Sequence, residues 1–187
     1  MRPYLKKILP SRFVIAFVLL IIHLQAEAQP SLEYQLKAVF LFNFTQFVEW
    51  PTGSFETDQS PLVIGILGEN PFGTYLDETV KGELIKGHPV VIRYYKNVAD
   101  VQSCHLLFIN ITESDKRKEA IEALKGKNIL TVSDAPDFAA QGGMIRFFTL
   151  QNKIKLQINL EACRESKLVL SSKLLKLAEI FKSNQNN

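Results

Sequence analysis

The stretch LVIGILGENP, residues 62–71, decides the fold class of this chain. Its first six residues are an unbroken apolar run, which is typical of a parallel strand buried on both faces. Asn70 followed by Pro71 is a favourable helix start, and we expect that helix to continue to about Val80. A buried strand that leads directly into a helix indicates an α/β fold.

The same alternation of strands and helices continues to the end of the chain. Residues 144–150 and 153–159 are predicted as paired strands, because Gln151-Asn152 stands where a two-residue hairpin turn is expected. Apolar and polar residues alternate in 153–159, which is typical of a half-exposed strand at the edge of a sheet. The other predicted elements are strands at 89–95, 105–109 and 128–132, helices at 114–125 (capped by Thr112 with Asp115) and 160–165, a helical turn at 136–140, and a final amphipathic helix that Ser171 caps and that carries Leu174, Leu177, Ala178 and Phe181 on one face.

Together these elements predict one α/β domain over residues 29–182, built as a three-layer sandwich. We expect a mostly parallel, flavodoxin-like or Rossmann-like sheet of strand order 2-1-3-4, extended by the antiparallel edge hairpin. Residues 183–187 are predicted to be a disordered tail.

Residues 1–28 have the three-part pattern of a secretory signal peptide. A basic start is followed by an apolar run at 13–22, and Ala26-Glu27-Ala28 then offers the small-x-small pattern of a cleavage site. The apolar run is about half of the ~20 residues that a membrane-spanning helix needs, so a retained anchor is the weaker interpretation. We predict cleavage after Ala28 and a mature protein that works outside the cytoplasm.

The charge balance argues against nucleic acid as a partner. Four of the 22 basic residues and one of the 19 acidic residues lie in the predicted leader, so 18 of each remain. A neutral protein without a dense basic stripe lacks the clustered cations that displace counterions from nucleic acid. We interpret Lys116-Arg117-Lys118 as a solvated helix face.

The sequence offers little for catalysis. His88 precedes a proline in a turn-like segment, and His105 is adjacent to Cys104, so their side chains should point to opposite faces of a strand. The sequence has no HExxH, GxSxG, Walker A or GxGxxG pattern, and its acidic residues are a weak basis for a metal site. We therefore predict a protein that is not an enzyme and that has no cofactor.

A ligand-binding edge is the alternative to a purely interacting protein. The loop after the first buried strand and the segment after 128–132 should meet at the carboxyl edge of the sheet, where open α/β folds bind ligands. The simpler interpretation is that glycine and asparagine make turns there, and that Asp134 and Asp137 cap helices. The candidate ligand residues are Gly68, Glu69, Asn70, Ser133 and Asp134, with Asn110 on the same edge.

The two cysteines leave three alternatives open. Cys104 and Cys163 could form one disulfide in a secreted chain, could form an intermolecular bond, or could be two buried thiols. Their spacing does not fit a CxxC redox motif.

A predicted helix at 33–50 is unusually apolar. Phe40, Phe44, Phe47 and Val48 lie on one face at helical spacing, yet apolar residues cover the other faces as well. Such a helix is buried on more than one side or is covered by a partner. Trp50-Pro51 should end it.

Several blocks of the sequence resemble the YfiR/HmsC-like family. The first and last blocks are the most specific, and together the blocks extend over nearly all of the chain beyond residue 28. They are KAVFLFNFTQFVEWP (37–51), VIGILG (63–68), CHLLFI (104–109), ILTVSD (129–134), GGMIRF (142–147), KLQIN (155–159) and SSKLLKLA (171–178).

The resemblance implies a non-enzymatic periplasmic regulator. Characterised members bind the periplasmic sensor domain of an inner-membrane diguanylate cyclase and repress it. When envelope stress releases them, cyclic-di-GMP rises and biofilm forms. A histidine kinase could take the place of the cyclase, and a homodimer is expected. A small-ligand binding module is the alternative.

For the partner surface we expect exposed aromatic residues from the first helix and the hairpin, namely Phe40, Phe44, Phe47, Phe147 and Phe148.

Overall fold

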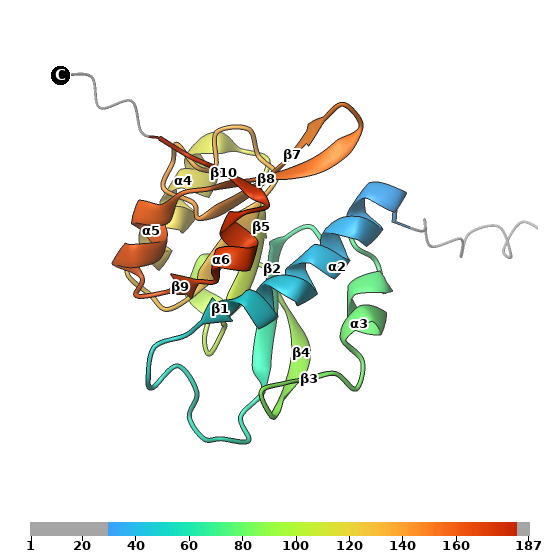
Figure 1. Ribbon diagram of the computed structural model, residues 1–187, viewed down its shortest axis with the longest axis vertical. Coiled ribbons are helices and arrows are strands. Elements are labelled where there is room, and N and C mark those ends of the chain that lie inside the picture. The colour runs from blue at the N-terminus through green and yellow to red at the C-terminus, as the bar shows by residue number, and fades with distance from the viewer. Residues whose placement is uncertain (1–29, 183–187) are drawn as a thin grey trace, which may run out of the picture.

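The computed structural model describes residues 30–182 as a central sheet with helices on both faces (Figure 1). The predicted signal peptide and the predicted tail lie outside the described residues. Within 30–182 no helix is long and apolar enough to cross a membrane.

The main sheet has eight strands in the order β10-β8-β7-β6-β5-β2-β4-β3, and β1 pairs with β9 in a separate two-stranded sheet. The strands are β1 (Val48–Glu49), β2 (Leu62–Gly68), β3 (Leu84–Ile85), β4 (His88–Tyr95), β5 (Leu106–Asn110), β6 (Leu130–Ser133), β7 (Ile145–Leu150), β8 (Lys153–Ile158), β9 (Val169–Leu170) and β10 (Ala178–Ile180). The helices are α2 (Leu32–Phe47), α3 (Tyr75–Val80), α4 (Ser114–Leu124), α5 (Leu160–Glu165) and α6 (Ser172–Leu175), with a short 3-10 turn at Val98–Asp100.

This topology confirms the predicted mostly parallel α/β sandwich. Strand β2 lies between β4 and β5 and is parallel to both, and β6 follows β5, which is the predicted order 2-1-3-4. The antiparallel hairpin β7–β8 is also confirmed. Gln151 and Asn152 have φ values of 51° and 59°, as a type I′ turn requires at both central positions.

The predicted final helix is wrong. Helix α6 has only four residues, and the chain then becomes strand β10, which pairs in parallel with β8. Strand β8 is therefore not at the edge of the sheet at its carboxyl end. The physical reason is the backbone of β8, whose outer polar groups need partners there. Strand β10 supplies them, and the amide of Phe181 donates to the carbonyl oxygen of Ile158 at 2.8 Å.

Several predicted boundaries are also corrected. Helix α3 begins at Tyr75, because Asn70 closes a turn with Phe72 and Gly73 instead of capping a helix. Helix α4 has no side-chain cap, since Glu113 stands at its N-cap. Helix α2 ends at Phe47, three residues earlier than predicted, because β1 begins there and pairs with β9.

The core has one layer on each face of the sheet. Helices α2, α3, α5 and α6 cover one face together with side chains such as Ile64 and Phe108. Helix α4 covers the other face with Val63 and Leu107. Gly65 faces this second layer, where an added Cβ would lie 2.7 Å from atoms of Tyr95 and Leu107. The sheet therefore needs glycine there to pack.

His105 fastens the loop at 50–61 to the start of the sheet. Its Nδ1 accepts a hydrogen bond from the Val63 amide at 3.1 Å, so its proton is on Nε2, which donates to the Ser54 carbonyl oxygen at 3.0 Å. The ring of Phe55 stacks between the rings of His105 and His88, with centroid separations of 4.2 Å and 3.9 Å. His88, expected in a turn, is instead the first residue of β4.

We predict that His105 makes the fold sensitive to acid. Burial lowers the pKa of His105 below its ordinary value of 6.5, since the charged ring would lose its hydration. Protonation of Nδ1 would also remove the hydrogen bond that Nδ1 accepts from the Val63 amide. The folded state then binds fewer protons than the unfolded state, so this stability is present above pH 6.5 and is lost as the pH falls.

Urea unfolding at several pH values checks this. At neutral pH His105→Asn should lower the free energy of unfolding by about 1–2 kcal/mol, because the hydrogen bond to Ser54 is lost. Its free energy of unfolding should then fall less on acidification than that of the unchanged chain. Equal losses of stability in the two proteins between pH 7.5 and 5.5 would contradict the prediction.

Candidate functional site

Strands β2, β5 and β6 end beside one another, which gathers the predicted ligand-edge residues at the carboxyl edge of the sheet. Gly68 has a φ of 97°, and a Cβ there would collide with the carbonyl group of Asn110. Glycine is therefore required for the close approach of these strand ends.

The polar groups at this edge bond mainly to one another. The Asn110 amide donates to the Glu69 carbonyl oxygen at 2.9 Å, and Asn70 is used in its own turn. The Ser133 hydroxyl donates to the Ile109 carbonyl oxygen at 2.7 Å. These residues thus lie at one edge of the sheet, and their observed hydrogen bonds fix the loops, in agreement with the simpler interpretation.

The start of helix α2 covers the same edge with an ion pair that the sequence reasoning missed. Lys37 is buried, and its ammonium lies 2.6 Å from the Asp134 carboxylate and 2.7 Å from that of Glu33. The Tyr34 hydroxyl donates to Asp134 at 3.0 Å, and burial and this carboxylate raise the pKa of Tyr34. Asp134 is therefore an anchor for α2 and not a helix cap.

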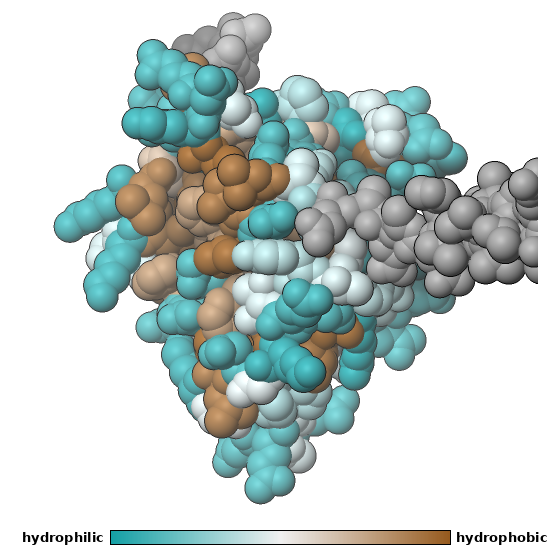
Figure 2. Space-filling model, turned by 90° about the vertical axis from the view of Figure 1, so that its right-hand side faces the viewer, coloured by the Kyte–Doolittle hydropathy of each residue, from teal (hydrophilic) through white to brown (hydrophobic). Residues whose placement is uncertain are grey.

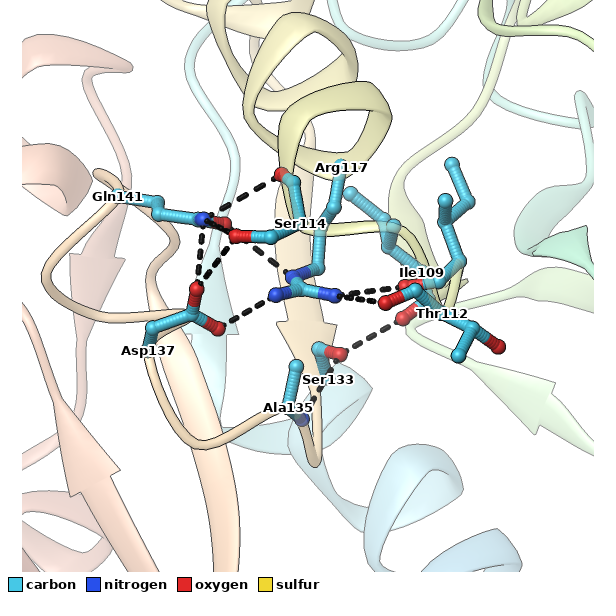
Figure 3. A network of polar contacts seen from close by, with 9 residues as sticks. Ile109, Thr112, Ser114, Arg117, Ser133, Ala135, Asp137 and Gln141 are labelled. Carbon is cyan, nitrogen blue, oxygen red and sulfur yellow. Dashed lines mark hydrogen bonds and ion pairs between the residues drawn. The ribbon is translucent and has the colours of Figure 1, made fainter.

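A second buried cation holds the loops on the other side of the sheet (Figure 3). Arg117, predicted on a solvated face, is buried and donates to the carbonyl oxygens of Ile111 and Thr112 at 2.7 and 3.2 Å. It also pairs with Asp137 at 2.5 Å and donates to Gln141 at 3.2 Å. Burial alone would raise the pKa of Asp137, but the hydrogen bonds that its carboxylate accepts from Ser114 and Arg117 lower this pKa. These contacts make Arg117 a structural residue.

An apolar groove lies between the start of α2 and the β7–β8 hairpin. It has a volume of about 490 Å³ and is lined by Leu32, Glu33, Leu36, Phe40, Thr149, Asn152, Lys153 and Ile154. Leu32 and Leu36 are 71% and 47% exposed. Figure 2 views the side of the molecule where α2 begins and shows apolar surface surrounded by hydrophilic side chains. This groove is the candidate functional site.

The structure divides the five predicted partner aromatics. Phe44 and Phe147 are buried, and their stacked rings have centroids 5.7 Å apart. The prediction that these two residues are exposed to a partner is therefore wrong, and both belong to the core. Phe40, Phe47 and Phe148 are half-buried, and Phe40 packs against Phe147 at 5.9 Å while it lines the groove. The sequence reasoning missed Leu32 and Leu36: the apolar residues on the other faces of the predicted helix signalled Leu36, whereas Leu32 precedes the predicted start of that helix at residue 33.

The cysteines are two buried free thiols, so the predicted alternative of an internal disulfide is not formed. Cys104 packs in the core layer on the α4 face, whereas Cys163 packs in the layer on the opposite face. Burial raises the pKa of each thiol to about 12, which makes both poor nucleophiles. In the part of the chain that the structure describes, no group of three metal-ligating side chains is suited to hold a metal ion.

A sequence profile described as YfiR/HmsC-like matches residues 34–179. The match begins in α2 and ends in β10, so it spans the sheet and both helical layers. The chain belongs to the YfiR/HmsC-like family. Members of this family are known as periplasmic regulators. A search of curated proteins found no match to the chain.

We predict that Asp134 stabilises this YfiR/HmsC-like fold through Lys37. Asp134→Ala leaves a buried ammonium with only the half-exposed carboxylate of Glu33, so the free energy of unfolding should fall by roughly 2–3 kcal/mol. Glu113→Ala is the control, because it breaks a solvent-exposed pair with Lys116 and should lower the free energy of unfolding far less. Urea unfolding measures both, and equal losses would contradict the anchoring role.

Proposed function

We propose that this protein is a non-enzymatic periplasmic repressor. It binds the periplasmic sensor domain of an inner-membrane signalling enzyme, a diguanylate cyclase or a histidine kinase, and holds the cytoplasmic output low. Membership of the YfiR/HmsC-like family supports a regulatory role. For a cyclase partner, release of the repressor raises cyclic-di-GMP and promotes biofilm formation.

The single observation that carries the proposal is the apolar groove beside α2. Leu32 and Leu36 leave large apolar area in water, next to the half-buried Phe40 and Ile154. Contiguous apolar surface with a polar rim is typical of protein interaction sites. Its concave shape suits an apolar anchor side chain of a partner.

Repression through this groove would work by a shift of populations. A bound protein favours the inactive conformation of the sensor domain only by its difference in affinity for the two conformations. To keep a two-state sensor nearly all inactive, the repressor needs a preference of about 10³–10⁴-fold. The proposal also includes a homodimer and export by the predicted signal peptide.

The first experiment is a crosslinking pull-down from envelope fractions with the tagged chain at native expression. Recovery of a membrane protein with a periplasmic sensor domain and a cytoplasmic cyclase or kinase domain supports the proposal and identifies the target. Recovery of the bait alone counts against it.

We predict that Leu36→Glu abolishes repression in a folded protein. The substitution places a charge in the groove, which should weaken partner binding by at least about tenfold because the carboxylate must be desolvated. Leu84→Glu is the matched control, since Leu84 is 63% exposed on β3, away from the groove.

Cellular cyclic-di-GMP, or kinase output, is the measurement, with the thermal unfolding of each variant as a check on folding. Leu36→Glu should derepress and Leu84→Glu should not. If Leu36→Glu represses like the unchanged chain, the groove is not the binding surface.

A further inference from the structure

The β7–β8 hairpin extends beyond the strands on either side of it. Strand β6 pairs with β7 only at Ile145 and Arg146, and β10 pairs with β8 only at 156–158. Residues 147–150 and 153–155 therefore have no strand on their outer sides within residues 30–182. In Figure 1 the hairpin projects outward from the sheet, above the start of α2.

The turn geometry sets which backbone groups face outward. In a two-residue turn the closing residues, Leu150 and Lys153, exchange both of their hydrogen bonds with each other. Pairing alternates along an antiparallel ladder, so the amide and carbonyl groups of Thr149 and Ile154 in the next pair point away from the hairpin. Thr149 is exposed, and its outward groups are open to an incoming strand.

The hairpin is cationic. Between Ile145 and Ile158 the sequence holds three basic residues, Arg146, Lys153 and Lys155, and no acidic residue. The cross-strand pairs Arg146–Gln157, Phe148–Lys155 and Leu150–Lys153 place all three cations on one face, with the Phe148 ring among them. In the described structure the Arg146 guanidinium makes a single long hydrogen bond, 3.4 Å to Gln157.

These charges select the kind of strand that can pair. Edge-to-edge pairing of two copies of the hairpin would bring like charges together, and lysine on an edge strand blocks such self-pairing. A strand with carboxylates on alternate residues would meet the cations favourably. Strand β7 offers the longer open edge, residues 147–150, against residues 153–155 of β8.

We infer that the open edge of β7 at residues 147–150 binds an extended acidic segment of a partner protein as an added strand. Backbone hydrogen bonds at Thr149 give affinity, and Arg146, Lys153 and Lys155 select carboxylates. The inference rests on the proposed function, in that the acidic segment belongs to the repressed sensor domain. It adds a second contact of different chemistry next to the apolar groove, which Thr149 and Lys153 also line.

The test uses the secreted chain and the purified periplasmic domain of the membrane protein that the pull-down recovers. Thr149→Pro removes an outward amide without breaking the hairpin ladder, so the Kd should rise about tenfold. Thr149→Val keeps the amide and should stay within about twofold of the unchanged chain. Hydrogen exchange should show that the amide of Thr149 becomes protected in the complex.

The charge selection has its own variant. Lys155→Glu, at a residue that does not line the groove, keeps the backbone edge, so it should raise the Kd about tenfold and reduce the weakening of binding by salt. Thermal unfolding of each variant shows whether the hairpin substitutions leave the fold intact.

The outcomes separate this inference from the proposed function. If the unchanged chain binds no sensor domain, both fail. If it binds, but Thr149→Pro and Lys155→Glu bind equally well and the Thr149 amide stays unprotected, the proposed function stands and the added strand is wrong. Protection at Ile154 instead, or a second copy of the chain on this edge, also overturns the inference.

Discussion

Strand β2 is buried on both faces, and that burial places each layer of the molecule. Ile64 points to the layer that α2 and α3 complete, and Val63 points to the layer of α4. Since a strand covered on both sides cannot satisfy its backbone with water, β4 and β5 must pair with it. The carboxyl edge, the start of α2 and the groove follow from this arrangement.

Much of the fold could be predicted from the sequence, because its strongest signals are local. An apolar run indicates a doubly buried strand, and Gln151-Asn152 adopts the positive φ values that a two-residue hairpin turn needs. The final strand could not be predicted in this way. Leu174 and Leu177 have helical spacing, yet Leu174 is buried and Leu177 is 65% exposed. The open backbone of β8 decides the conformation there, and no local pattern encodes it.

The buried ion pairs and the candidate site were predicted less well, and for the ion pairs the reason is that their partners lie far away in the sequence. Lys37 and Asp134 are 97 positions apart, and Arg117 bonds across 20 residues to Asp137. A cation in a polar stretch suggests solvent until its partner is known. The aromatic residues of the first helix were equally ambiguous: periodicity grouped Phe40 with Phe44, but only the folded structure shows that Phe44 is buried and Phe40 half-buried.

Helix α2 links the buried charges to the proposed binding surface. Its inner face packs Ala38, Leu41 and Phe44 into the core, while its outer face leaves Leu36 in the groove. The bonds of Lys37 and Tyr34 to Asp134 lie one turn or less from Leu36 and fix the start of the helix to the carboxyl edge of β6. A groove wall held in this way loses little conformational freedom on binding, so its affinity for a partner depends on an ion pair that the partner need not touch.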